Sequence, residues 1–405
     1  MLTGHKSDHL DDTLYNALQD RAARDTIRRV HLKGSNAELL NSIIFSIITK
    51  GEETRSISVQ SFILWNCSIA RSNIDISDFF SRYYFPKLQH LDIYGCSISS
   101  WDLLRSRITS LTTLSLATSK LSPLPTLSQM LSILSVNPNL QCLVLSCGSL
   151  PNVGSNRCSP QIKLRHLKTL HLGDDLGCVF ELLDRLELPD KMDDLSLSLS
   201  ECSPSDLPQT LGTYLGNCVR RRSLDRLRLS VDPDPTDFSI LVGDTYDGSS
   251  AWENGFMTVD WTTSVTLEEG EVNKLCFDII AHIPLEKVTK VTTTLPILRS
   301  EELCVWMCNL THLHLEGADL STWFAGPDIR EPHIFKDILH WLRSITIEEP
   351  NLSSGDWGPL TDFLTRRAAV GNRISSLSLS RYPHMGGGVV ESIRRAVEVF
   401  QRRGE

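Results

Sequence analysis

Two histidines separated by one residue are the clearest candidates for chemistry in this 405-residue sequence. His312 and His314 alternate with leucines, so a β-strand through them would place both imidazole rings on one face. Glu316 follows on that face, and Glu348 ends a similar segment further on. Imidazole and carboxylate groups bind metals and transfer protons. The earlier histidines lie too many segments away to complete such a site. The favoured interpretation is therefore a polar surface, with a metal or acid–base site as the alternative.

Other patterns that support catalysis or cofactor binding are missing from the sequence. It has no GxSxG elbow, no HExxH motif, and neither a GxGxxG nor a GxxxxGK(S/T) loop. Gly386–Gly388 precede a helical pattern, but no lysine with serine or threonine follows in the register that phosphate binding needs. Cys304 and Cys308 share a helix face, yet a metal site there would need two more ligands. We expect no catalytic residue, no cofactor and no metal, and predict that the protein is not an enzyme.

A recurring pattern, L-x-x-L-x-L-x-x-(C/N/S)-x-L, covers nearly the whole chain. Full copies begin at Val59, Leu88, Leu111, Leu140, Leu310 and Leu342, weaker copies at Ile27, Leu167, Met192, Leu224, Val288 and Ile374, and a doubtful copy at Phe256. Their spacing of about 22 to 32 residues is typical of leucine-rich repeats. The central L-x-L has the period of a short strand, and helical periodicity follows it.

A strand and a helix of this kind bury their apolar faces only when successive copies stack. We therefore predict an α/β fold. It is a leucine-rich-repeat solenoid of about twelve layers, with a curved parallel sheet on the concave side and helices on the convex side. The ninth pattern position should point inward, where a small or polar group satisfies backbone amides. That position is occupied by Cys67, Cys96, Ser119 and Ser200.

The repeats define the expected domain organisation. Residues 1–26 form a polar N-terminal lead-in or cap, and residues 27–384 form the repeat array. Within the array, residues 232–255 are rich in Asp, Gly, Pro and Ser, which predicts a loop-rich insertion. Residues 385–405 should form a C-terminal capping helix. One face of that helix would carry Val390, Ile393, Val397 and Phe400.

The side chains that point out of the predicted sheet suggest a partner-binding surface. The first layer is basic there, with Arg29, His31 and Lys33. Trp65 and Tyr94 share one column in the next two layers. Exposed Trp, Tyr and Arg are the usual anchors of protein interfaces, so we predict partner contact here. Packing beneath the N-terminal residues is the alternative interpretation.

Two further pairs complete the candidate partner-binding residues. Arg226 and Arg228 lie two positions apart, hence on one strand face, and would take an acidic or phosphorylated segment through bidentate bonds. An ordinary solvated surface is the alternative for this pair. His312 and His314 form the second pair.

Composition narrows the class of partner. The formal net charge of −9 argues against nucleic-acid binding. No apolar run approaches the roughly 18 residues of a membrane span, and the N-terminus lacks the layout of a secretion signal. The 11 cysteines include no CxxC pair, which is typical of reduced thiols. We expect a cytoplasmic or nuclear protein.

Four segments carry a narrower resemblance. They are IRRVHLKGSNAELL from Ile27, FPKLQHLDIYGCSI from Phe85, SQMLSILSVNPNLQCLVL from Ser128 and LRHLKTLHLGDDLGCVFELLDRLELP from Leu164. They resemble the F-box/leucine-rich-repeat proteins abundant in mushroom-forming (basidiomycete-type) fungi. In that family the F-box binds the Skp-type adaptor of a cullin ubiquitin ligase, and the repeats recruit a substrate. Residues 1–25 contain no Leu-Pro-x-Glu-Ile/Leu opening of an F-box, so the resemblance covers the repeat region only.

These observations lead to a functional hypothesis. The chain would be a protein–protein interaction module, the substrate-recognition part of an F-box-type ubiquitin ligase receptor or its F-box-less remnant. Its partner would be a substrate protein, with a Skp-type adaptor added if an F-box exists upstream. The alternative is a stand-alone leucine-rich-repeat scaffold or inhibitor with no ubiquitin link.

Overall fold

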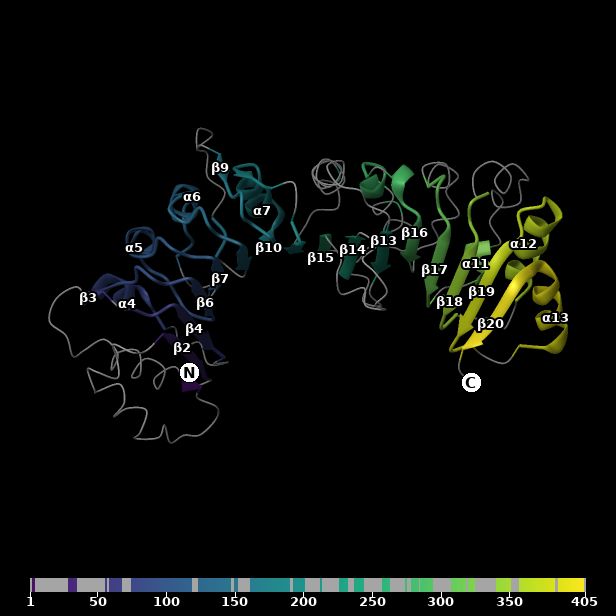
Figure 1. Ribbon diagram of the computed structural model, residues 1–405, viewed down its shortest axis with the longest axis horizontal. Helices are drawn as coiled ribbons and strands as arrows, with labels where there is room; N and C mark the ends of the chain where they lie inside the picture. The colour runs from purple at the N-terminus through teal and green to yellow at the C-terminus, as the bar shows by residue number, and fades with distance from the viewer. Residues whose placement is uncertain are drawn as a thin grey trace. The chain divides into compact units, whose positions relative to one another are not determined.

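The chain forms two compact units, Met1–Ser200 and Glu201–Glu405 (Figure 1). The computed structural model describes residues 2–3, 28–34, 55–56, 58–67, 74–118, 123–146, 149–151, 161–189, 192–200, 212, 226–231, 237–243, 257–262, 274, 278–283, 285–293, 307–317, 320–324, 340–350, 357–382 and 385–403. Apart from Leu2 and Thr3, the expected lead-in 1–26 lies outside these residues. Each unit contains a sheet and helices, which confirms the α/β class.

The sheet of the N-terminal unit is parallel, and its strands follow one another in chain order. The strands are β1 (Leu2–Thr3), β2 (Arg29–Gly34), β4 (Ser61–Asn66), β6 (His90–Tyr94), β7 (Thr113–Ala117), β8 (Cys142–Ser146), β10 (Thr169–Asp175) and β12 (Asp194–Ser200). From β2 onward, each strand occupies the central positions of one predicted copy. Two short pairs complete the unit, β3 (Arg55–Ser56) with β5 (Tyr83–Tyr84) and β9 (Ile162–Lys163) with β11 (Leu186–Glu187).

Apolar side chains that alternate along these strands form continuous buried rows. One row runs through residues that pair in register across seven strands: Leu32, Leu64, Ile93, Leu116, Leu145, Leu172 and Leu197. All seven are buried. Because successive side chains of a strand point to opposite faces, this row fixes which residues remain on the other face.

Short helices between the strands cover the buried rows. In the N-terminal unit they are α4 (Ser77–Arg82), α5 (Trp101–Arg107), α6 (Leu127–Ser135) and α7 (Leu176–Leu183), which lie along one side of the strands in Figure 1. Thr126 and Gln129 form a capping box at the start of α6, and Asp175 accepts a bond from Cys178 N at the start of α7. None of the helices that the structure describes has the length and apolar character needed to cross a membrane.

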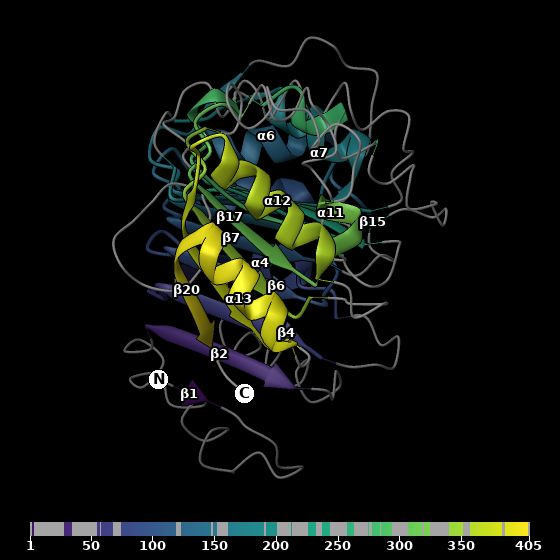
Figure 2. The same ribbon diagram turned by 90° about the vertical axis from the view of Figure 1, so that its right-hand side faces the viewer.

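The C-terminal unit begins with an antiparallel segment and continues with parallel strands. Its strand order is β15 (Met257–Thr262), β14 (Asp237–Gly243), β13 (Arg226–Val231), β16 (Lys290–Thr293), β17 (His312–Glu316), β18 (Ser344–Glu348), β19 (Ile374–Ser380) and β20 (Val397–Arg403). Strands β13, β14 and β15 pair antiparallel, whereas β13 and β16 to β20 pair parallel. The helical elements are η2 (Leu285–Lys287), α11 (Leu320–Phe324), α12 (Gly358–Ala369) and α13 (Gly387–Ala396), and α12 and α13 lie side by side (Figure 2).

Two expectations for this unit are wrong in part. Within the insertion 232–255, predicted as loop, residues 237–243 form β14, because Phe238, Ile240 and Val242 alternate with the period of a strand. Residues 232–236 and 244–255 of that insertion lie outside the described part. The doubtful copy at Phe256 contains a strand, β15, but it pairs antiparallel and so is not a further parallel layer.

The C-terminal helix is shorter than expected. It ends at Ala396, and residues 397–403 form β20, which pairs parallel with β19. Val390 and Ile393 are buried on the helix as predicted. Val397 and Val399, however, are β-branched and alternate with polar residues, a pattern that favours an extended chain over another helical turn. Val397 accordingly has the extended dihedrals φ −122° and ψ 157°.

The ninth pattern position behaves differently in different layers. Cys96 is buried as expected, and burial raises the pKa of its thiol to about 12. Cys67 is exposed, so the prediction that it points inward is wrong. Asn66, one residue earlier, is buried instead and donates from Nδ2 to the Gly95 carbonyl at 3.0 Å. Ser200 is partly exposed, and Ser119 lies outside the described residues.

Buried polar side chains connect the turns of successive layers. Asn137, which follows α6, donates to the carbonyls of Ile108 and Ile133 and accepts a bond from Leu111 N at 2.9 Å. In the C-terminal unit, Arg367 of α12 donates to the Leu342 carbonyl at 2.9 Å. Arg367 is fully buried, and desolvation lowers the pKa of its guanidinium to about 10. Each side chain satisfies backbone groups that no strand or helix pairs.

Replacing Asn137 by alanine should destabilise the N-terminal unit by about 3 kcal/mol, because the substitution leaves several buried backbone groups without partners. Urea unfolding followed by circular dichroism measures the loss. Ser128→Ala, at an exposed position of α6, is the control and should change the unfolding free energy by less than about 0.5 kcal/mol. Equal effects of the two substitutions would show that Asn137 does not anchor these turns.

Candidate partner-binding surface

The face of the N-terminal sheet opposite the buried rows, called the open face below, consists of three columns of side chains. The columns are Arg29, Ser61, His90, Thr113, Cys142, Thr169 and Asp194; His31, Ile63, Asp92, Ser115, Val144, His171 and Ser196; and Lys33, Trp65, Tyr94, Ala117, Ser146, Gly173 and Ser198. Each of these residues is partly or fully exposed. The predicted outward positions are therefore confirmed in this unit, and Trp65 and Tyr94 do share a column.

Trp65 is held by neighbours on both adjacent strands. Its indole Nε1 donates to Asp92 Oδ2 at 2.9 Å, and the Lys33 ammonium lies 4.7 Å from the ring centroid. The His31 ring meets it nearly edge-on, with centroids 6.0 Å apart and an interplanar angle of 76°. The indole is therefore fixed in place rather than free to rotate. Tyr94, next to it in the column, is 52% exposed and is available to a partner.

The ends of β4 and β6 are joined directly behind this pair of rings. Asn66 follows Trp65, and its bond to the Gly95 carbonyl ties the two strand ends together. Gly95 has a φ of 69°, in the left-handed region that glycine adopts without strain. Its amide donates to the Ala117 carbonyl at 2.7 Å, which continues the connection to β7. The backbone beneath Trp65 and Tyr94 is thus rigid.

Charge is distributed unevenly on the open face. Arg29 and Lys33 are exposed, and within the described residues neither forms an ion pair. The carboxylates of this face already have partners, since Asp92 accepts from Trp65 and Asp194 lies 2.5 Å from His171 Nε2. The exposed cations of the face are therefore together on β2, whereas the two carboxylates lie on β6 and β12.

The structure also bears on the alternative that N-terminal residues cover the aromatic pair. Of residues 1–27, Leu2 and Thr3 are described, and they form β1, which pairs with Val30 and His31 at the edge of β2. This strand extends the sheet beside the basic layer. Tyr94, two strands further along, keeps its exposure. Residues 4–27 lie outside the described part, so covering of the aromatic pair by N-terminal residues stays an alternative prediction.

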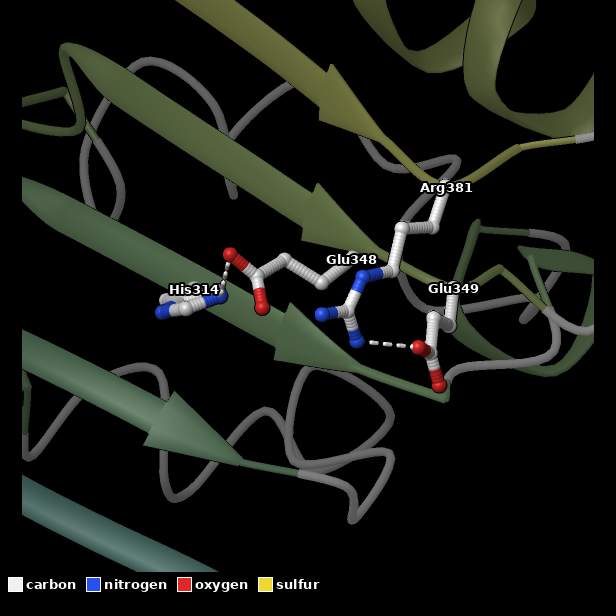
Figure 3. A network of polar contacts seen from close by, with 4 residues as sticks. All are labelled: His314, Glu348, Glu349 and Arg381. Atoms are coloured by element: carbon white, nitrogen blue, oxygen red, sulfur yellow. Dashed lines mark hydrogen bonds and ion pairs between the residues drawn. The ribbon is translucent and has the colours of Figure 1, made fainter. Parts of the chain in front are cut away.

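The histidine–glutamate candidates lie on the C-terminal sheet, where one contact joins two of them (Figure 3). His314 Nε2 is 3.7 Å from Glu348 Oε1, which is too long for a hydrogen bond but close enough for an ion pair. His312, His314 and Glu348 occupy three different columns, since they pair with Ser344, Thr346 and Glu316. The Nδ1 atom of His312 is 2.7 Å from Thr311 Oγ1. Among the described residues, no three His, Cys, Asp or Glu side chains gather in a way that would hold a metal ion.

A second ion pair lies beside this contact. Arg381 Nη1 and Glu349 Oε1 are 2.5 Å apart, and the hydrogen bond and charge of Glu349 raise the pKa of the arginine (Figure 3). Glu349 and Arg381 follow the ends of β18 and β19 with positive φ angles of 48° and 50°. Both side chains are well exposed, so the pair contributes little to stability.

Arg226 and Arg228 lie on β13, where register but not side-chain position is described. The register pairs Arg226 with Lys290 and Arg228 with Thr292 on β16. Lys290 pairs in turn with His312 on β17. The two arginines thus alternate along one strand, as predicted, and their anion-binding role stays a prediction.

Sequence reasoning missed the residues that position the candidate anchors. The repeat pattern predicts that Asp92 points outward, but its bond to the Trp65 indole depends on a side-chain rotamer that no repeat pattern encodes. Glu349 and Arg381 follow strands in turns with left-handed backbone, which neither residue type signals. The signal that did exist was the shared column, because neighbouring strands in register bring equivalent positions together.

Cys142 provides a test of electrostatics on the open face. Burial, followed by the charges of Asp194 and Asp92, raises the pKa of its thiol. Asp194→Asn should lower that pKa and so accelerate alkylation of Cys142 by iodoacetamide at pH 8, because the thiolate is the reactive form. Peptide mass spectrometry gives the rate, with the exposed Cys67 as internal reference. Asp193→Asn, the same charge change one residue away, should leave the rate unaltered, and equal acceleration by both variants would contradict this view.

Comparison with known proteins gives no independent identification. The sequence matches no protein-family model and no curated protein sequence. The resemblance to F-box/leucine-rich-repeat proteins therefore stands on the quoted segments alone. The geometry itself provides an open parallel-sheet face with a hydrogen-bonded indole, an exposed tyrosine and two exposed cations on β2 that form no ion pair among the described residues.

Proposed function

We propose that this chain is a protein–protein interaction module that binds its partner through the open face of the N-terminal unit. The observation that carries the proposal is the aromatic pair at β4 and β6. Tyr94 is half exposed, and Trp65 is held beside it by Asp92 and Lys33. Large aromatic rings that are both accessible and preorganised lose little conformational entropy on binding, which makes them effective anchors.

We further propose that the fold is a leucine-rich-repeat solenoid with its strands on the concave side. Consecutive strand order and parallel pairing in the N-terminal unit, and parallel pairing from β16 to β20 in the C-terminal unit, support this assignment, as do the helices between the strands. The recurring sequence pattern with its spacing of about 22 to 32 residues supports it as well. Solenoids of this class use the open sheet face as an extended binding surface.

The biological role that the sequence resemblance favours is substrate recognition for an F-box-type ubiquitin ligase in the cytoplasm or nucleus. In such a receptor the repeats hold the substrate while the F-box holds the Skp-type adaptor. The second candidate is a stand-alone scaffold or inhibitor with no ubiquitin link. Both candidates use the open face in the same way.

Replacing both rings, Trp65→Ala with Tyr94→Ala, should remove most partner binding, because each interface anchor of this kind is worth about 2 kcal/mol or more. Proximity labelling in cells, quantified by mass spectrometry, measures the loss. Proteins labelled by the native chain should be labelled about tenfold less, or weaker still, by the double variant. The matched control is Trp341→Ala, which removes a 43% exposed ring from the C-terminal unit. Unchanged labelling by the double variant, with its thermal unfolding also unchanged, would exclude this surface.

Co-purification with the adaptor separates the two candidate roles. A ligase receptor should co-elute with a fungal Skp-type adaptor on size-exclusion chromatography, whereas a stand-alone scaffold should elute apart from it. The double variant at Trp65 and Tyr94 should behave like the native chain here, since the adaptor is held by an F-box and not by the repeats. Separate elution, together with a genomic sequence upstream of Met1 that encodes no F-box, would reject the ligase role and leave the interaction function in place.

A further inference from the structure

We infer that the partner presents an acidic protein segment to the open face, an inference that rests on the interaction function proposed above. Carboxylates of the segment would pair with Arg29 and Lys33 on β2. An apolar side chain of the same segment would pack against Trp65 and Tyr94.

The exposed positive charge of the open face is concentrated on β2. Both cations of β2 are exposed and have no ion pair among the described residues, although Lys33 also lies over the Trp65 ring. The carboxylates of Asp92 and Asp194 already have donors within the face. These carboxylates lie on β6 and β12, away from the two cations, so a basic segment would be repelled at β2. An acidic segment gains two attractions and disrupts no existing bond.

The spacing of these residues defines the shape of the segment. Arg29 and Lys33 are four residues apart on one strand, which separates their Cα atoms by about 13 Å. Lys33, Trp65 and Tyr94 follow one another across three strands, over about 10 Å. The basic and aromatic residues therefore meet at Lys33 in an L-shaped surface. The segment must carry two acidic groups about 13 Å apart, one for Arg29 and one for Lys33. Its apolar side chain must lie near the acidic group that pairs with Lys33.

Small side chains beyond Tyr94 leave room for the apolar side chain. The column continues through Ala117, Ser146, Gly173 and Ser198. Each of these side chains is smaller than a tyrosine, so an apolar side chain of the partner has room beside the exposed ring of Tyr94. An aliphatic or aromatic side chain of the partner would lie on Ala117 with one side against that ring.

Charge complementarity also selects among macromolecules. Nucleic acid presents many phosphates and is bound by proteins with extended basic surfaces. This chain has a formal net charge of −9, and its open face has two exposed lysine or arginine side chains on β2. Two cations beside two aromatic rings fit a short peptide with a few carboxylates. The partner is therefore a protein.

Selection from a phage-displayed library of random linear peptides tests the inference. The bait is the full chain, and the best-enriched peptide is then synthesised with a fluorescein label for anisotropy titrations. Three double variants are titrated in parallel: Arg29→Glu with Lys33→Glu, Trp65→Ala with Tyr94→Ala, and Lys87→Glu with Arg105→Glu. The last pair makes the same charge change at exposed residues outside the open face.

The expected result is enrichment of Asp and Glu beside an apolar residue. Charge reversal at Arg29 and Lys33 should lower the affinity for the peptide about tenfold or more, and added salt should lower the affinity of the native chain as well. Reversal of Lys87 and Arg105 should change the affinity by less than about threefold.

Two failures are distinguishable. The acidic partner would be rejected if the selected peptides lack Asp and Glu enrichment. It would also be rejected if their affinity is unchanged by charge reversal at β2 but still depends on Trp65 and Tyr94. Both outcomes keep the interaction function. Peptides that bind independently of both pairs, or a failure to select any peptide, would overturn both.

Discussion

The register of parallel strands is the constraint on which the rest of the N-terminal unit depends. A row of apolar residues from Leu32 to Leu197 is buried across seven strands, and a slip of one residue in any strand would expose its member of the row. The same slip would turn the outward side chains into the core. Packing of the leucine row therefore also holds the open face, although none of its residues touches that face.

This constraint explains what could be predicted from the sequence. The strand positions and the outward columns follow from a period of two that recurs at regular intervals, and the structure confirms them in the N-terminal unit. The pattern was less informative where a segment satisfied two periods. Residues 397–403 match both a helical face and a strand, and pairing with β19 decided between them. Residues 237–243 have the period of a strand, but the Asp, Gly, Pro and Ser residues on both sides give the whole insertion the composition of a loop.

In the candidate site, too, the backbone register was predictable and the side-chain contacts were not. Which residues share a column was predictable, because register is a property of the backbone. Which side chains bond to each other was not, because the Asp92–Trp65 bond and the Arg381–Glu349 pair depend on rotamers and on left-handed turn residues. Burial one position away from the expected one, at Asn66 instead of Cys67, shows the limit of a pattern that carries no side-chain geometry.

At Gly95 the backbone conformation determines where an interface side chain lies. A β-carbon at this position would overlap the carbonyl oxygen of Asn66, and the positive φ would add strain of its own. Any larger residue must therefore shift the strand end that carries Trp65. Because the overlap is with the backbone of residue 66, no change of side chain there would relieve it, and glycine is expected to be retained at position 95. A substitution at Gly95, which is not in the columns of the open face, would thus move a residue of the proposed binding surface.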